Sequence, residues 1–208
     1  MNPRAVIFDF GGVLCFPPTE RQLSEAAALC GLTTSEFIEA FWRKRREYDR
    51  GTAPAVYWRD LAQSNQLEFD DAMVAEMVRR EIDFWSHYDQ RVFDWIGELR
   101  RAGLRTSILS NLPWPLADRL RATPGFLEHF DQVTFSCEIG VIKPEREIYE
   151  YALRGLGVAP EEAVFFDDRE DNIEGARSLG IRAELFTTWE DLVARMETDP
   201  QLRSLKTP

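Results

Sequence analysis

The stretch Val6–Phe16 reads VIFDFGGVLCF, and its pattern guides the interpretation of the whole chain. An apolar run ends at a single carboxylate, Asp9, and Gly11 stands two residues later, where a second acid would be expected. Such a run, followed by an acid and two glycines, is typical of a strand that enters a sharp turn. A lone Asp here is often only a turn former, so the neighbouring motifs decide its role.

Five short apolar or β-branched runs are bounded by turn residues or charge, and helical periodicity lies between them. This pattern predicts an α/β fold with a Rossmann-like parallel sheet and crossover helices. Residues 90–103, for example, place their apolar side chains on one helical face and close at Gly103. The five runs are AVIFDF (5–10), LRTSILSN (104–111), QVTFSC (132–137), AVFFDD (163–168) and RAELFT (182–187).

The interval 17–88 differs because it is poor in strand signals and reads as four successive helices. We expect the second, TSEFIEAFWRKRREYDRG, to begin at a cap on Thr34 or Ser35 and to end at Gly51. Since the interval lies between the first and second strands, it predicts an all-helical cap domain inserted into the core. The expected domains are 1–16 with 89–208 for the core, and 17–88 for the cap.

The overall charge excludes some classes of partner. With 25 basic and 36 acidic residues the net charge is −11, which disfavours nucleic acid and anionic membrane surfaces. No apolar run approaches the roughly 20 residues that cross a bilayer, and the amino terminus does not resemble a signal peptide, so we expect a cytoplasmic protein. Cys15, Cys30 and Cys137 form no CxxC motif and are expected to be buried free thiols.

Polar residues follow several of the predicted strands. Ser110 and Asn111 end the second strand, the adjacent acids Asp167 and Asp168 end the fourth, and Lys143 lies in the loop GVIKPE. The carboxyl ends of parallel strands share one edge of a sheet, where ligands bind. Neighbouring carboxylates repel each other unless a cation neutralises them, so the acidic pair favours a hard divalent metal such as Mg²⁺.

Other polar residues carry weaker signals. His87 and His129 do not lie at a strand end, so no Ser-His-Asp triad is proposed. The run RKRRE at 43–47 is typical of a solvated helix face, although a cap helix over the site could turn Arg43 or Arg46 inward.

Four segments in order, IFDFGGVL, SILSN, IKPEREIY and VFFDDREDNIEGARSLG, resemble the four motifs of the haloacid dehalogenase (HAD) superfamily. The resemblance covers essentially the whole chain, with the helical insertion in the place of that family's cap. Within the superfamily the chain is similar to sugar-1-phosphate phosphatases and to the amino-terminal phosphatase domain of epoxide hydrolases. It implies a HAD fold and a phosphatase that acts on a small phosphorylated metabolite.

The resemblance also implies roles for individual residues. Asp9 would be the nucleophile that forms an aspartyl-phosphate, and Lys143 would neutralise charge on the nucleophile and the phosphoryl group. Ser110 and Asn111 would donate hydrogen bonds to the phosphoryl oxygens.

The implied cofactor is Mg²⁺. It would be held by the Asp9 carboxylate, the backbone carbonyl of Gly11 and Asp168. Asp167 and Asn172 would support these ligands from behind.

Gly11 departs from the family pattern. Most HAD phosphatases carry there a second Asp that protonates the leaving oxygen, and losing such a general acid costs roughly 10²- to 10⁴-fold in rate. We therefore expect a preference for activated substrates such as sugar 1-phosphates, acyl phosphates or aryl phosphates. A carboxylate of the cap, Glu47 or Asp49, is a candidate substitute.

Two other functions stay open at this point. Hydrolytic dehalogenation of a 2-haloacid would use the same Asp9, but in this family it runs without Mg²⁺ and lacks the acidic pair represented here by Asp167 and Asp168. The second is a catalytically impaired HAD fold that binds a phosphorylated ligand, and Gly11 is the only feature of the sequence that supports it. The sequence does not determine the oligomeric state.

Overall fold

A five-stranded parallel sheet forms the centre of the computed structural model, which describes residues 3–200 and 202–206. Its order is β3-β2-β1-β4-β5, so β1 lies in the middle. The strands β2 and β3 are added on one side of β1 and the strands β4 and β5 on the other, which makes the gap between β1 and β4 the switch point of the strand order. The strands are β1 (Ala5–Phe8), β2 (Arg105–Ser110), β3 (Gln132–Phe135), β4 (Ala163–Asp167) and β5 (Arg182–Leu185). The α/β fold expected from the sequence is confirmed.

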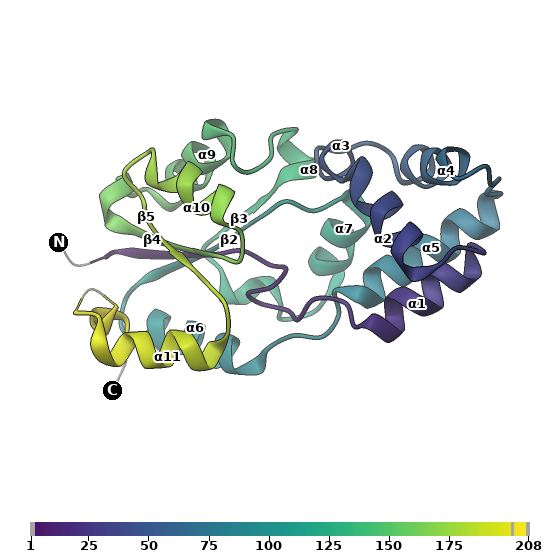
Figure 1. Ribbon diagram of the computed structural model, residues 1–208. Helices are drawn as coiled ribbons and strands as arrows, with labels where there is room; N and C mark the ends of the chain where they lie inside the picture. The colour runs from purple at the N-terminus through teal and green to yellow at the C-terminus, as the bar shows by residue number, and fades with distance from the viewer. Residues whose placement is uncertain (1–2, 201, 207–208) are drawn as a thin grey trace.

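Helices cover both faces of this sheet, because the central strands β1 and β4 are buried along their whole length and need cover on each side. In Figure 1, α6 and α11 lie on one face, and α9 and α10 lie on the other. The sheet lobe contains α6 (Gln90–Arg101), α7 (Trp114–Ala122), α8 (Ser136–Ile139), α9 (Arg146–Leu156), α10 (Glu170–Arg177), α11 (Trp189–Thr198), η1 (Leu127–His129), η2 (Pro160–Glu162) and η3 (Arg203–Leu205).

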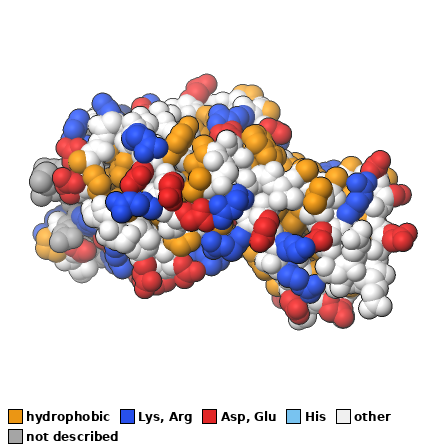
Figure 2. Space-filling view, turned by 90° about the horizontal axis from the view of Figure 1, so that it is seen from above, with side chains coloured by type: hydrophobic (Ala, Val, Ile, Leu, Met, Phe, Trp, Pro, Cys, Tyr) orange, Lys and Arg blue, Asp and Glu red, His pale blue; other side chains and the backbone are white. Residues whose placement is uncertain are grey.

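The helices between β1 and β2 form a separate lobe, which we call the helical lobe (Figure 1). They are α1 (Glu20–Leu29), α2 (Thr34–Arg43), α3 (Arg45–Asp49), α4 (Pro54–Ser64) and α5 (Asp71–Phe84). This lobe has its own apolar core, built around Phe37, Phe41 and Trp58. Seen from above, the outline narrows between the lobes, and side chains of both charges are interspersed on the surface (Figure 2). The domain boundaries given above stay a prediction.

The segment 34–51 differs from the single helix that its sequence suggests. The backbone leaves helical geometry at Lys44, with φ −120° and ψ 25°, and divides the segment into α2 and α3. The helix begins one residue earlier than expected, because Thr33 is the N-cap and exchanges side-chain and backbone hydrogen bonds with Glu36.

Two further expectations were tested by the structure. All three cysteines are buried free thiols. Within residues 3–200 and 202–206, no helix is both long enough and apolar enough to cross a membrane.

Candidate active site

Asp9 lies immediately after the carboxyl end of the central strand β1, next to the switch point of the strand order. Its N–H donates to the carbonyl of Phe166 at 2.9 Å, which extends the pairing of β1 with β4 and places Asp9 beside Asp167. The Asp9 side chain is buried, with 7% of the residue exposed, and its Oδ1 accepts a hydrogen bond from the Phe10 N–H at 2.6 Å. The carboxylate is thus held in a fixed orientation.

Lys143 joins the two strand ends. Its Nζ lies 2.8 Å from Asp9 Oδ1 and 2.6 Å from Asp167 Oδ2, and only 2% of the residue is exposed. Burial alone would lower the pKa of Lys143, but the Asp167 and Asp9 carboxylates raise it above its ordinary value, so the side chain stays an ammonium. Both contacts on Asp9 end at Oδ1, which leaves Oδ2 as the oxygen available for attack.

Asn111 positions the loop that carries this lysine. Its Oδ1 accepts from the Lys143 N–H at 2.7 Å, and its Nδ2 donates to the Lys143 carbonyl at 3.0 Å. The Asn111 carboxamide, which was predicted to bind a phosphoryl group, therefore bonds the Lys143 backbone with its oxygen and with one N–H. The second N–H of Nδ2 is left for a ligand. Ser110, at the end of β2, is buried beside it.

Asp167 is fully buried and surrounded by donors. Besides Lys143, it accepts bonds from Asn172 Nδ2 at 2.9 and 3.0 Å and from the Arg169 N–H at 2.8 Å. The Tyr149 hydroxyl in turn donates to the Asn172 carbonyl at 2.8 Å. Asp167 is therefore suited to fix Lys143. A metal ion could bind the Asp167 carboxylate only by displacing some of these donors.

Asp168 is the exposed member of the group. Carboxylate oxygens of Asp9, Asp167 and Asp168 lie within 4.8 Å of one another, a spacing that suits a cation. A Cβ at Gly12 would come 2.6 Å from Asp168 Oδ2, and Gly12 has a φ of +76°. Only glycine lets the turn after β1 approach Asp168 this closely.

The charges of this cluster do not balance. Three carboxylates face one ammonium, an excess of two negative charges that matches a divalent cation. Without one, burial raises the pKa of Asp9 to about 7, and the charges of Asp167 and Asp168 add to the effect. Desolvation and then the Asp167 charge raise the pKa of Asp168. Near neutral pH, Asp9 therefore binds either a proton or a cation.

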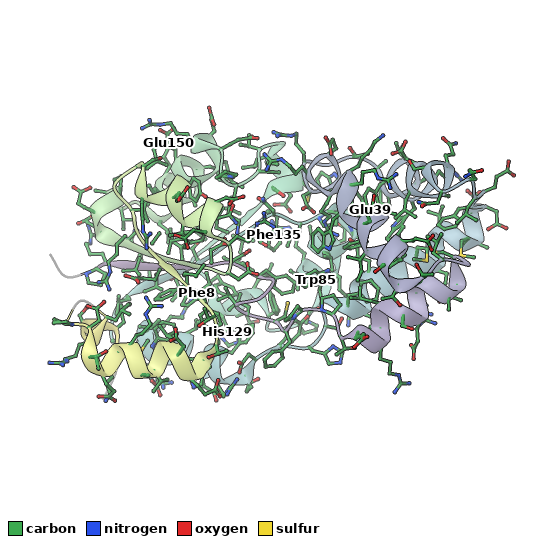
Figure 3. All side chains as sticks on the ribbon, viewed as in Figure 1. Phe8, Glu39, Trp85, His129, Phe135 and Glu150 are labelled. Atoms are coloured by element: carbon green, nitrogen blue, oxygen red, sulfur yellow. The ribbon has the colours of Figure 1, made fainter. Side chains whose placement is uncertain are left out.

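Trp85 closes the site on the side of Gly11, a role that the sequence did not reveal. A Cβ at Gly11 would lie 2.9 Å from Trp85 Cζ3, so the indole occupies the space that a side chain would take. Trp85 follows α5 and packs against the apolar cores of both lobes. Figure 3 shows it between the sheet and the helical lobe. Its buried Nε1 has no hydrogen-bond partner within the described part of the chain.

The chain resembles several proteins named phosphatases. A phosphoserine phosphatase of Thermus thermophilus is 36% identical over 108 residues, 51% of this chain and 41% of that protein. Phosphatase MT3486 of Mycobacterium tuberculosis is 29% identical over 192 residues, 89% of this chain and 88% of that protein. The chain spans 14% and 41% of the lengths of two curated relatives that it matches, which are larger proteins.

Solved structures share the fold. The crystal structure of HAD family enzyme bt-2542 from Bacteroides thetaiotaomicron, in complex with magnesium and inorganic phosphate, superposes with a TM-score of 0.72 at 21% identity. The match covers 92% of this chain and 99% of that one. In sequence, the model of the haloacid dehalogenase-like hydrolases matches residues 3–180. The resemblance carried by the four motifs is thereby confirmed, and the chain belongs to the haloacid dehalogenase-like hydrolase family.

Proposed function

We propose that this hydrolase is a Mg²⁺-dependent phosphomonoesterase that works through an aspartyl-phosphate on Asp9. The observation that carries the proposal is the buried Asp9–Lys143–Asp167 cluster with its excess of two negative charges. The names of the phosphatase relatives support it, as does the magnesium and phosphate in the bt-2542 structure. These observations favour phosphoryl transfer over dehalogenation, which needs no divalent cation.

The residues fit the proposed metal. The Asp9 carboxylate, the backbone carbonyl of Gly11 and the exposed Asp168 carboxylate would hold it, because hard oxygen ligands suit Mg²⁺. Asn172 holds Asp167, and Asp167 in turn holds Lys143, which contacts Asp9. Bound Mg²⁺ would neutralise negative charge on the phosphoryl oxygens.

The remaining chemistry belongs to the chain. Asp9 Oδ2 attacks phosphorus, the bond to the leaving oxygen breaks, and a covalent acyl phosphate forms. Lys143 favours the ionised form of Asp9 and offsets charge on the transferred group, while Ser110 and the free N–H of Asn111 Nδ2 are the proposed donors to its oxygens. Water then attacks phosphorus, releasing inorganic phosphate and regenerating Asp9.

The proposed substrate is a small phosphorylated metabolite of the cytoplasm. Gly11 provides no acid beside the leaving oxygen, and Trp85 fills the space, so the core alone favours leaving groups of low basicity. The leaving groups of sugar 1-phosphates, acyl phosphates and aryl phosphates are less basic than the alkoxide of a primary alcohol, and the anomeric oxygen of a sugar 1-phosphate is more basic than an aryl oxide.

A phosphatase panel with and without Mg²⁺ tests this proposal. We expect Mg²⁺-dependent release of phosphate from p-nitrophenyl phosphate, acetyl phosphate and glucose 1-phosphate, and slower release from glucose 6-phosphate. Asp9→Asn keeps the shape of the side chain and should abolish every activity. Release of halide from a 2-haloacid in place of phosphate would show a dehalogenase, and phosphate binding without turnover would show a sensor.

A further inference from the structure

Asp49, the last residue of α3, is a carboxylate of the helical lobe that is buried against the sheet lobe. Only 7% of the residue is exposed. Its carbonyl accepts a hydrogen bond from Ser136 Oγ at 2.5 Å, and the same Oγ accepts from the Leu112 N–H at 3.0 Å. Because Leu112 directly follows Ser110 and Asn111, this contact anchors Asp49 at the rim of the active site.

A second contact holds the end of α3 from the other side. Arg50 forms two hydrogen bonds with the carboxylate of Glu145, at 2.6 and 2.8 Å, and Glu145 lies two residues after Lys143. Asp49 is therefore placed between the loop after β2 and the loop that carries Lys143. Burial raises the pKa of its carboxyl group, and the positive charges of Arg45, Lys143 and Arg169 offset part of this rise. The other cap candidate, Glu47, is exposed.

The carboxyl group of Asp49 belongs to a buried cluster that has too few positive charges. Arg45 Nε lies 2.7 Å from Asp49 Oδ1, Arg45 Nη1 lies 2.6 Å from Glu81 Oε1, and the Tyr48 hydroxyl donates to Glu81 Oε2 at 3.0 Å. Two carboxyl groups thus share one guanidinium. Burial raises the pKa of both Asp49 and Glu81. Two buried carboxylates beside one guanidinium leave one excess negative charge, which a proton on one of them would neutralise.

We propose that Asp49 is the general acid–base of the phosphatase reaction and takes the role that Gly11 cannot fill. The inference rests on the proposed function. As Asp9 attacks phosphorus and the bond to the leaving oxygen breaks, the proton of the Asp49 carboxyl group passes to that oxygen. Arg45 stabilises the carboxylate that remains. In the second half of the reaction Asp49 takes a proton from the attacking water, and its initial state is restored.

The test compares two substrates in one variant. In Asp49→Asn, kcat/KM for glucose 1-phosphate, whose leaving oxygen needs a proton, should fall by at least about 10²-fold. For p-nitrophenyl phosphate, whose leaving group departs as a stable anion, the fall should stay within about fivefold. An equal fall for both substrates, or none for either, would overturn the proposal.

Two variants serve as controls. Asp89→Asn also removes a buried carboxylate paired with an arginine, here Arg91 at 2.7 Å, and it should leave the ratio between the two substrates unchanged. Glu47→Gln removes the exposed cap carboxylate and should also have no effect on the ratio. A selective loss of glucose 1-phosphate hydrolysis in Glu47→Gln would assign the proton to Glu47 and refute Asp49.

A measurement on the unaltered chain keeps the proposal testable if Asp49→Asn does not fold. Across a series of aryl phosphates, kcat/KM should depend weakly on the basicity of the leaving group, because a proton is supplied. A steep dependence would overturn the role of Asp49 while leaving the phosphatase function intact. Failure of the proposed function looks different: no substrate would then be hydrolysed in a Mg²⁺-dependent way.

Discussion

Gly11→Asp, which restores the acid found in most family members, should damage this protein. The new Cβ would lie 2.9 Å from Trp85 Cζ3, where an ordinary contact needs 3.4 Å or more, and the carboxyl group would need still more room. Overpacking of this kind costs about 1–3 kcal/mol of the free energy of unfolding. For a chain of this size each kcal/mol lowers Tm by about 2–4 °C. Glucose 6-phosphate hydrolysis should not improve, because the carboxylate has no space to reach the leaving oxygen.

The double variant Gly11→Asp with Trp85→Leu separates steric blocking from chemistry. Leucine removes the ring that occupies the position, so Tm should recover relative to Gly11→Asp alone. The new acid should then raise kcat/KM for glucose 6-phosphate, by roughly tenfold or more given the 10²- to 10⁴-fold worth of a well-placed acid. Trp85→Leu alone is the control and should show no such gain. If Gly11→Asp by itself keeps its Tm and gains activity, the steric argument is wrong.

Two further predictions concern the metal. In Gly12→Ala the new Cβ would meet Asp168 Oδ2 at 2.6 Å and would strain a backbone with a φ of +76°, so the Mg²⁺ concentration for half-maximal activity should rise by roughly tenfold or more; an unchanged value would exclude Asp168 as a ligand. Because burial raises the pKa of Asp9 to about 7, well above its value in the unfolded chain, the metal-free protein should lose stability as the pH rises from about 4 through 7. Mg²⁺ competes with that proton, so the Tm increase that it causes should be larger at pH 8 than at pH 5.5, and equal increases would contradict the proton–metal exchange.

The sheet could be predicted because its signals are local. Each strand is a short apolar run bounded by turn residues, and all five are found at their expected places with slightly earlier ends. The break at Lys44 could not be predicted, because it turns Arg45 toward Glu81, which lies 36 residues further along the chain. The run at 43–47 was expected to be a solvated helix face from which Arg43 or Arg46 could turn inward; both are exposed, and the buried arginine of the run is Arg45.

The site could be predicted as far as strand order determines it. The ends of β1 and β4 bring Asp9, Asp167 and Asp168 together, as the parallel topology requires. Side-chain partners are set by packing instead. Asn111 carries the right group for a phosphoryl contact, yet the structure directs it to the Lys143 backbone. No motif marks Trp85 as a site residue, and its position at Gly11 is set by packing between the two lobes.

In the proposed reaction the sheet lobe supplies the nucleophile, and the helical lobe supplies the proton donor. The nucleophile and its lysine are held by contacts with residues of the sheet lobe, Asp167 and Asn111. The proposed proton donor, Asp49, reaches the site only while α3 is docked through Ser136 and Glu145. Protonation of the leaving oxygen by Asp49 therefore depends on the docked position of α3. Such a division would let the sheet handle any phosphoryl group while the helical lobe selects the leaving group.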